Sequence, residues 1–379
     1  MSMAKKNILF VTATRAEFGK IKNTISMLNK NKKYNITIIV TGMHMMSKYG
    51  STYLEVKNFF PKNKIIYFKN QTENQTQDIA LSTTIKKISP ILKKISPDLI
   101  VIHGDRVEAL AVAISGSFNN YLIAHLEGGE VSGTIDEHIR HSVSKLSHLH
   151  FVSNKFARKR LLQLGELKKS IFITGSPETD IMRLKNLPSL RSVKERYGIT
   201  FKNYCILLYH PVTTEKNNKI QSDLNCLLKV IKFSSRNFLV IYPNNDPGSK
   251  IITSNYTQKY KKLKNVKIFR SIRFEYFLTL LKNSKCIIGN SSSGVREAPF
   301  YGVPSIDLGS RQKNRTQNKS IFNLNFNVKK ILKTLDALNK KKFSIAKLYG
   351  EGDSAKKIVK ILNSNNIWLT PRQKYLQEI

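Results

Sequence analysis

Short apolar runs alternate with amphipathic segments along the first half of the chain. The runs lie at residues 7–13, 34–42, 97–105 and 120–129, and segments with helical spacing of their apolar residues follow them. Continuous apolar runs of this length predict strands that are buried on both faces, as in a parallel sheet covered by helices. This half of the chain therefore predicts a doubly wound α/β domain.

The same alternation begins again after a polar stretch at residues 185–198, which we interpret as a linker. The apolar runs of the second half lie at residues 204–211, 237–246, 266–271, 284–294 and 303–310. A chain of 379 residues exceeds one ordinary core, so two domains are expected. Ligands of such domains bind beyond the carboxyl ends of the strands, and we expect a cleft between the two domains.

Two local signals concern individual helices. Pro90 lies inside the helical segment at residues 78–95, and a proline there predicts a kink or a break because it lacks a backbone N–H. Near the end of the chain, a glycine turn precedes a helical pattern that Asp353 or Ser354 is expected to cap.

Composition restricts the class of protein. The hydrophobic content of 41% and the aromatic content of 9% are typical of globular proteins. No apolar run reaches the ~18–20 residues of a membrane span, and the first apolar run reads as a buried strand instead of a signal peptide. The spacing of Cys205, Cys226 and Cys286 disfavours a zinc site or a disulfide framework and favours a reducing cytoplasm.

The formal net charge of +39 raises the question of nucleic-acid binding. The lysines are spread over most of the expected helices, however, and no DNA- or RNA-binding motif accompanies them. We interpret the charge as a solvated basic surface that attracts an anionic small substrate, with no specific nucleic-acid partner.

Candidate chemistry lies where the expected strands end. The Ser/Gly loop at residues 290–294 precedes a helix that we expect to begin near Val295. Backbone N–H groups and serine hydroxyls there would bind a phosphate, although a serine before a helix is also an ordinary cap. Glu297 either accepts from a ribose diol or favours the helix dipole.

Arg15, Asp105 and His210 also follow expected strands. Arg15 would grip a diphosphate, or it is a surface arginine. Asp105 is either an acidic group of a site or the N-cap of the next helix. A lone histidine such as His210 is either a packing residue or a catalyst.

Acids gather beside a glycine-rich turn between His125 and His150. Glu127 ends a strand, and Asp136 follows on the next helix, one turn before Arg140. These acids are either paired acid and base groups or residues that favour a helix start.

The chain resembles the UDP-N-acetylglucosamine 2-epimerases in several segments. The segments are TRAEFGKIK, HGDRVEAL, HLEGGEVSGTID, GSPETD, HPVTTE, NSSSGVRE and YGEGDSAKKIV, and the resemblance extends from near Ile8 to near Leu362. It is greatest to the hydrolysing branch, which supplies N-acetylmannosamine for sialic acid synthesis.

The resemblance implies a GT-B-like fold of two Rossmann-like domains, at residues 1–175 and 176–363, with a C-terminal helix at residues 364–379 that crosses back to the first. It implies anti elimination of UDP from UDP-N-acetylglucosamine, which gives 2-acetamidoglucal, and then addition of water, which gives N-acetylmannosamine. It also implies no metal or redox cofactor and a homodimer or homotetramer.

The resemblance further implies roles for site residues. The catalytic residues would be Asp105, Glu127, Asp136 and His210, without a decision on which carboxylate is the base. The residues that bind the substrate would be Arg15, Arg106, Phe274, Asn290, Ser291, Ser292, Gly294, Glu297 and Arg311.

The segments HGDR and HLEGGEVSGTID favour the hydrolysing branch. We hypothesise that the glycine-rich loop is loose and lets water reach the glycal. Relatives of this branch also act on UDP- or GDP-N,N'-diacetylbacillosamine in legionaminic acid synthesis, which is the alternative substrate. A basic GT-B-like glycosyltransferase or a nucleic-acid-binding protein is the alternative of another class.

Overall fold

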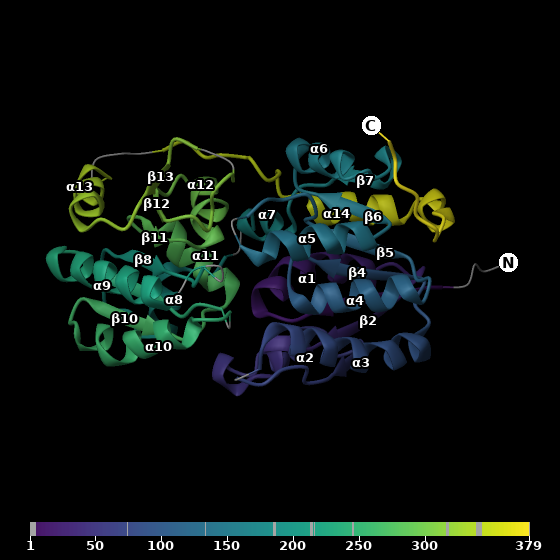
Figure 1. Ribbon diagram of the computed structural model, residues 1–379, viewed down its shortest axis with the longest axis horizontal. Helices are drawn as coiled ribbons and strands as arrows, with labels where there is room; N and C mark the ends of the chain where they lie inside the picture. Colours follow the sequence, from purple (N-terminus) through teal and green to yellow (C-terminus); the bar gives the residue numbers. More distant parts are fainter. Residues whose placement is uncertain are drawn as a thin grey trace. The chain divides into compact units, whose positions relative to one another are not determined.

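The computed structural model describes residues 5–378, apart from residues 74, 133, 185–186, 213–214, 216, 245, 316–317 and 339–342 (Figure 1). The chain divides into two compact units. Unit 1 comprises Met1–Glu130, Asp136–Arg183 and Tyr349–Ile379, and unit 2 comprises Val131–Ile135 and Leu184–Leu348.

Unit 1 contains a seven-stranded parallel sheet in the order β3-β2-β1-β4-β5-β6-β7. Its strands are β1 (Lys6–Thr12), β2 (Tyr34–Val40), β3 (Lys64–Tyr67), β4 (Leu99–His103), β5 (Ile123–Leu126), β6 (Leu149–Val152) and β7 (Ile171–Ile173). The strand order reverses between β1 and β4. Ligands of such sheets bind beyond the carboxyl ends of the strands at this reversal, so the loops after β1 and β4 are the first places to look for a site.

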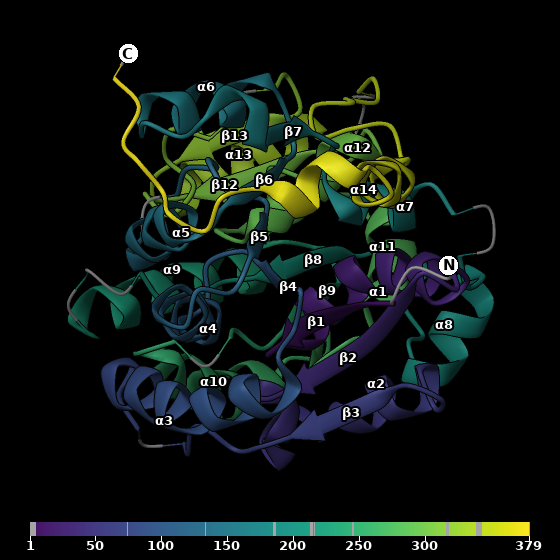
Figure 2. The ribbon, with the colours of Figure 1, turned by 90° about the vertical axis from the view of Figure 1, so that its right-hand side faces the viewer.

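Helices cover both faces of this sheet. They are α1 (Arg15–Asn29), α2 (Tyr53–Phe59), α3 (Gln77–Ile95), α4 (Val107–Phe118), α5 (Ile135–Leu146), α6 (Lys155–Gln163), α7 (Pro177–Met182) and α14 (Ser354–Leu362), with 3-10 turns η1 (Gly42–Met45), η2 (Ser47–Tyr49), η3 (Lys168–Ser170) and η6 (Asn365–Leu369). Figure 2 shows α3 and α4 on one face and α1 and α14 on the other. The main core lies on the second face, where Phe10 of β1 joins Ile25 of α1 and Ile358 of α14.

Unit 2 contains a six-stranded parallel sheet in the order β10-β9-β8-β11-β12-β13, which reverses between β8 and β11. Its strands are β8 (Cys205–Leu208), β9 (Phe238–Ile241), β10 (Val266–Phe269), β11 (Ile287–Gly289), β12 (Ser305–Leu308) and β13 (Ile321–Leu324). Its helices are α8 (Leu190–Tyr197), α9 (Asn217–Phe233), α10 (Ser249–Gln258), α11 (Phe274–Lys282), α12 (Glu297–Phe300) and α13 (Val328–Leu338), with 3-10 turns η4 (Tyr260–Lys262) and η5 (Ser292–Gly294). The two parallel sheets confirm the predicted α/β class with two Rossmann-like, doubly wound parts.

The prediction of a C-terminal helix at residues 364–379 is wrong. Helix α14 ends at Leu362, and η6 is the only helical turn after it among the described residues. Pro371 explains part of the difference, because a proline disfavours the helical conformation of the residue before it. The C-terminal helix of unit 1 is α14, which begins after the glycine turn as expected, with Asp353 at the N-cap position but without a cap bond from its side chain.

Two further local predictions can be compared with the structure. Of the two alternatives at Pro90, a kink or a break, the break is wrong, because helix α3 continues through Pro90 to Ile95. Pro90 is exposed, as is Lys86 one turn earlier, so water can bond to the carbonyl that loses its helical partner. The stretch at 185–198 is more than a linker, because Leu190–Tyr197 forms α8, which Ser189 caps at its start.

Candidate active site

Glu127 is the centre of the candidate site. It follows β5 directly and has a left-handed backbone, with φ of +64°. This conformation is costly for a residue with a Cβ atom, and such strain is concentrated at functional sites. The side chain is also buried, with 4% of its surface exposed.

Two hydrogen bonds and one ion pair hold the Glu127 carboxylate. Nε2 of His103, the last residue of β4, lies 3.0 Å from Oε2 of Glu127. Nζ of Lys20 lies 3.6 Å from the same oxygen, and the hydroxyl of Ser176 donates to Oε1. A buried carboxylate needs such partners to stay charged, and together they fix the positions of both oxygens.

Lys20 and Glu178 extend this cluster, although hydrophobic patterning does not single them out. Lys20 lies on α1, and its Nζ is 2.7 Å from Oε2 of Glu178 on α7. Glu178 is completely buried. Both residues lie in segments that carry the family resemblance, TRAEFGKIK and GSPETD, and that is the signal by which the sequence could have found them.

Asp105 and Asp136 lie at the same edge of the sheet in unit 1. Asp105 follows β4 and forms an ion pair with Arg140 of α5. Arg140 is buried, and its Nη1 also donates to the carbonyl of Glu130 at 3.1 Å. Asp136 precedes Arg140 by one turn and is partly buried. The alternative role of Asp105 as a helix cap is wrong, because Arg106 occupies the N-cap position of α4.

His125 connects the turn after β4 to helix α5 at this edge of the sheet. Its Nε2 is 2.7 Å from the carbonyl oxygen of Gly104, and its Nδ1 is 3.0 Å from the hydroxyl of Ser144 on α5. Complete burial lowers the pKa of His125 to about 3, so the ring is neutral. Neutral His125 therefore donates from Nε2 to Gly104 and accepts from Ser144, which fixes the turn that carries Asp105.

The glycine-rich loop after β5 is tightly packed where the structure describes it, so the hypothesis of a loose loop is not supported there. A Cβ atom at Gly128 would lie 2.7 Å from Oγ of Ser144 and 2.9 Å from Nδ1 of His125. One at Gly129 would lie 2.3 Å from the carbonyl oxygen of Ala157. The two glycines are therefore needed for close packing. Gly133, in the same loop, lies outside the described residues.

Arg15 and Arg106 lie after β1 and β4, on either side of the strand reversal. Nε of Arg15 is 2.9 Å from Oε2 of Glu55, and Nε of Arg106 is 3.7 Å from Oε2 of Glu108. Both guanidinium groups are therefore oriented by a carboxylate. A diphosphate contact by either residue stays a prediction.

In unit 2, His210 follows β8 and is fixed by Asn290, which follows β11. Oδ1 of Asn290 accepts from the His210 N–H at 2.7 Å, and Nδ2 donates to the His210 carbonyl at 2.8 Å. Nδ1 of His210 accepts from the backbone N–H of Asn244 at 3.3 Å. In the neutral ring the proton of His210 therefore lies on Nε2, and Nε2 is the nitrogen that can donate a hydrogen bond to a ligand. Asn290 acts here through His210, and direct substrate contact by Asn290 stays a prediction.

The helix that follows the Ser/Gly loop is shorter than expected. Instead of one helix from Val295, the structure has η5 (Ser292–Gly294) and the four-residue helix α12. Ser291 caps η5 by accepting from the Ser293 N–H at 3.3 Å. So short a helix has a weak dipole, and an anion here would depend on N–H groups and hydroxyls. Glu297 is buried, and its Oε1 accepts from the Ser293 hydroxyl at 3.4 Å.

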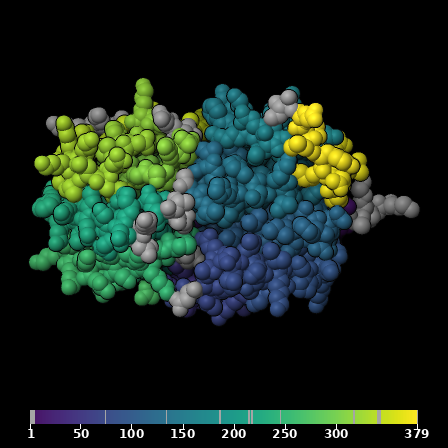
Figure 3. All heavy atoms as spheres, viewed as in Figure 1, coloured from purple at the N-terminus to yellow at the C-terminus, as the bar shows by residue number. Residues whose placement is uncertain are grey.

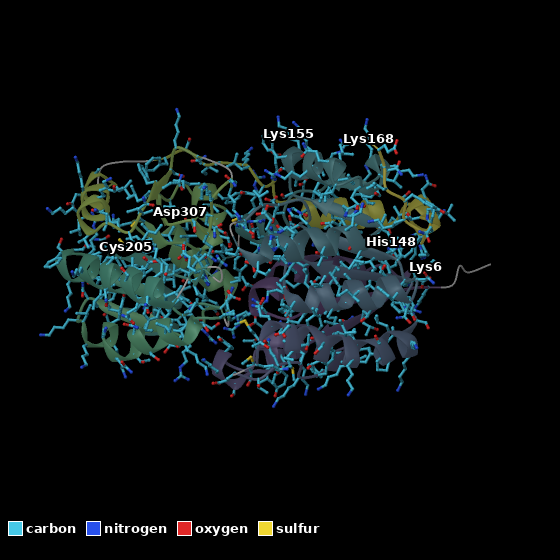
Figure 4. The ribbon with its side chains drawn as sticks, in the orientation of Figure 1. Lys6, His148, Lys155, Lys168, Cys205 and Asp307 are labelled. Atoms are coloured by element: carbon cyan, nitrogen blue, oxygen red, sulfur yellow. The ribbon has the colours of Figure 1, made fainter. Side chains whose placement is uncertain are left out.

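Other residues of unit 2 surround this loop. Arg311 and Gln312 both donate to the carbonyl of Asn290, at 3.3 and 2.8 Å. Phe274 starts α11 and is buried, with 8% of its surface exposed. Asp307, labelled in Figure 4, lies in β12 opposite Gly289, and burial raises its pKa to about 7 against the opposing effect of nearby arginines. Sequence patterns did not select Asp307, because an acid inside a buried strand has no local signature.

Two doubly wound units with charged side chains after their central strands define an α/β protein suited to a phosphorylated ligand. The chain belongs to the UDP-N-acetylglucosamine 2-epimerase family, whose model matches residues 26–363.

Known relatives extend over nearly the whole chain. A UDP-N-acetylglucosamine 2-epimerase of Neisseria meningitidis serogroup B is 44% identical over 97% of this chain and 98% of its own length. A UDP-N,N'-diacetylbacillosamine 2-epimerase (hydrolyzing) of Legionella pneumophila is 32% identical over 95% of this chain and 96% of its own. The crystal structure of the Methanocaldococcus jannaschii UDP-GlcNAc 2-epimerase in complex with UDP-GlcNAc and UDP has a TM-score of 0.81 at 23% identity, and it covers 94% of this chain and 99% of its own. That last likeness supports the fold.

Among the described residues, no helix combines the length and the apolar character that a membrane crossing requires.

Proposed function

We propose that the protein is a hydrolysing UDP-N-acetylglucosamine 2-epimerase, which converts UDP-N-acetylglucosamine and water into N-acetylmannosamine and UDP. The observation that carries the proposal is the buried Glu127 carboxylate, held by His103, Lys20 and Ser176. Removal of a weakly acidic proton from carbon requires a carboxylate that is fixed against the substrate in this way.

The names of relatives support the hydrolysing reaction. Relatives of Legionella pneumophila and Campylobacter jejuni at 32% and 34% identity are named as hydrolysing. Proteins named only as UDP-N-acetylglucosamine 2-epimerases include that of Neisseria meningitidis, at 44% identity, as well as those of Campylobacter jejuni, Methanocaldococcus jannaschii and Yersinia pestis, at 24%, 24% and 20%. The name of the Neisseria meningitidis protein does not state whether it hydrolyses its substrate, so experiment decides this point. The polysialic acid biosynthesis protein P7 of Escherichia coli, at 32% identity, supports a place in sialic acid synthesis.

The proposed reaction has two steps. In the first, a carboxylate takes the proton from C2, the C1–O bond breaks on the opposite face, and UDP leaves with the electron pair, which gives 2-acetamidoglucal. In the second, water adds across the C1–C2 double bond, with hydroxide at C1 and a proton at C2 on the other face. The sum is UDP-N-acetylglucosamine plus water to N-acetylmannosamine plus UDP.

Unit 1 supplies the acid and base groups of this proposal. The base and its partner are among Asp105, Glu127 and Asp136. Asp105 is paired with Arg140, and Glu127 contacts His103, Lys20 and Ser176, so both carboxylates are held in fixed positions.

Unit 2 supplies groups for the departing diphosphate. His210 has its Nδ1 engaged by Asn244, so its Nε2–H is the donor that would neutralise charge on the leaving oxygen. The hydroxyls of Ser291 and Ser292, together with the N–H groups of η5, would bind the phosphates, and buried Glu297 would accept from the ribose.

The decisive experiment is incubation with UDP-N-acetylglucosamine in D₂O, followed by NMR. Free UDP and N-acetylmannosamine with deuterium at C2 are expected. Accumulation of UDP-N-acetylmannosamine without free UDP would show a non-hydrolysing epimerase and overturn the proposal.

Variants of the three carboxylates test the site. Asp105→Asn, Glu127→Gln and Asp136→Asn are expected to lose roughly 10²–10⁴-fold in turnover, the usual contribution of a general acid or base, while UDP still binds. Feeding 2-acetamidoglucal to each variant separates the two steps. Near wild-type turnover in all three would remove this site from the reaction.

UDP-N,N'-diacetylbacillosamine is a second candidate substrate, because relatives at 32% and 34% identity are named for this sugar. The same chemistry at C2 serves both sugars. Comparison of kcat/KM for the two nucleotides decides between them, and a value at least tenfold higher for the diacetylbacillosamine nucleotide would replace the first proposal.

A further inference from the structure

A cavity of about 730 Å³ lies in unit 1 where β6 and β7 begin. Residues that precede these strands form one side, and the C-terminal segment from Lys360 to Tyr375 forms the other. Figure 3 shows this segment, in yellow, on the surface of unit 1. Because the strands are parallel, the cavity lies at the opposite edge of the sheet from Glu127, and it is separate from the candidate active site.

The size and lining of this cavity are those of a small-molecule site. Such sites measure about 300–1,000 Å³ and are mostly apolar with a few polar groups. Here the apolar lining is supplied by Leu149, Leu167, Phe172, Ile361, Ile367 and Leu369. A protein side chain inserted from outside would fill only a small part of this volume.

The charged groups around the cavity favour an anion. Lys169, Lys360 and Lys374 line it together with one acid, Glu166. The negative charge of Glu166 is already balanced by two lysines, since Nζ of Lys374 lies 2.7 Å from its Oε2 and Nζ of Lys145 lies 3.3 Å from its Oε1. The charges of Lys169 and Lys360, both exposed, are therefore not matched by this acid and remain to attract a ligand.

The floor of the cavity is a rigid polar cluster. Glu166 also contacts Nε2 of His150 at 2.9 Å, and Nζ of Lys374 donates to the carbonyls of Lys145 and Ser147 at the end of α5. His148, labelled in Figure 4, lines the cavity and donates from Nε2 to the carbonyl of Arg372 at 2.9 Å. These bonds fix the C-terminal segment over the strand ends, so the cavity is preformed.

We propose that this cavity binds an anionic amphiphile, a small molecule with an apolar body and one carboxylate head, in the manner of a fatty acid. The apolar body lies against the leucine and isoleucine side chains, and the head lies between Lys169 and Lys360. The cavity is separate from the candidate active site, so a nucleotide should not displace the ligand by direct competition.

Isothermal titration calorimetry of the full chain with decanoate at physiological salt tests this proposal. Asn366→Trp, at an exposed position on the lining, and the pair Lys169→Glu/Lys360→Glu are each expected to weaken binding roughly tenfold or more. The matched control is Lys57→Glu/Lys93→Glu, which makes the same charge change at exposed positions elsewhere in unit 1. This control should bind decanoate like the wild type.

Other outcomes overturn the proposal. Equal weakening by the control pair would show attraction to the basic surface in general, and equal binding of 1-decanol would show an apolar groove without a head-group site. Displacement of decanoate by UDP would place it in the candidate active site. Loss of an oligomer in Asn366→Trp, without a change in decanoate affinity, would assign this face to a second copy of the chain.

Discussion

At the scale of one residue, substitution of His103 tests whether its contact with Glu127 is needed for turnover. His103→Gln removes the ring whose Nε2 lies 3.0 Å from the carboxylate, while the contacts of Glu127 with Lys20 and Ser176 remain. We expect turnover to fall about 10–100-fold through misplacement of Glu127, with the affinity for UDP unchanged.

His150 provides the control for that prediction. It is also a buried strand histidine with a glutamate partner, and its Nε2 lies 2.9 Å from Oε2 of Glu166 at the far edge of the sheet. His150→Gln should lower the melting temperature and leave kcat nearly unchanged. If both variants lose turnover in proportion to their stability, His103 has only a structural role.

Gly128 is a second residue whose substitution can be tested, because there is no room for a Cβ atom at this position. A Cβ atom there would lie 2.7 Å from the Ser144 hydroxyl and 2.9 Å from the His125 ring. Gly128→Ala should therefore cost about 1–3 kcal/mol of unfolding free energy, as overpacking does. Adding Ser144→Ala should restore part of this loss in urea unfolding. An unchanged stability of Gly128→Ala would support the hypothesis that the loop is loosely packed.

At the scale of elements, α14 is capped by a residue distant in sequence. Both oxygens of Asp180 on α7 accept at 2.7 Å, from the backbone N–H groups of Ser354 and Ala355. Asp353 occupies the N-cap position, but its side chain does not cap the helix. Asp180→Ala should therefore cost roughly 1–2 kcal/mol, the usual worth of a cap, measured by urea unfolding.

Asp353→Ala is the matched control for this experiment. Asp353 is half exposed, and its carboxylate lies 3.0 Å from Nζ of Lys357, an arrangement worth little at a surface. Its loss should change stability by less than about 0.5 kcal/mol. A larger effect from Asp353 than from Asp180 would show that the local residue caps the helix after all.

The cap shows how far sequence reasoning extends. Apolar periodicity and turn residues predicted most strands and the start of α14, because these depend on neighbours in sequence. The Asp180 cap joins residues 174 positions apart, and Lys20 meets Glu178 across the fold, so no local pattern reveals either contact. The short strand β13 was missed, and the helix expected near Val295 is only the four residues of α12, since so few residues carry too little periodicity.

At the scale of the whole molecule, the longer of the two segments that form unit 2 begins after Arg183 and ends before Tyr349, and both of these flanking residues lie near α7. The Ser176 N–H donates to the Tyr349 carbonyl at 2.6 Å, and the Ser176 hydroxyl also holds Glu127. The connections of unit 2 are therefore attached to the element that positions the candidate catalytic carboxylate.

The two units should respond to acid in opposite directions. In unit 1, burial lowers the pKa of His44 and of His125 from 6.5 to about 3. Between pH 6.5 and 3 the unfolded chain binds protons at these residues that the folded chain does not, so their contribution to stability is lost as pH falls. From pH 7.5 to 5.5, each costs of the order of 1 kcal/mol, while the raised pKa of Glu17 and Asp180 opposes part of this loss.

In unit 2 the sign is reversed at Asp307. Burial raises its pKa from 3.8 to about 7, so in this range the folded chain binds a proton that the unfolded chain does not. The contribution of Asp307 to stability therefore grows as pH falls from 7 and diminishes as pH rises through 7. Asp307→Asn removes this dependence and is the matched control.

Each unit carries its own reporter for the experiment. The single tryptophan of the chain, Trp368, lies in unit 1, and its three cysteines, of which Cys205 and Cys286 are buried, lie in unit 2. In urea, the midpoint of Trp368 fluorescence should fall relative to that of thiol labelling when the pH is lowered from 7.5 to 5.5. Asp307→Asn should make this relative shift smaller. Coincident midpoints at both pH values would show that the two units unfold as one cooperative body, and that the opposing titrations do not govern either unit separately.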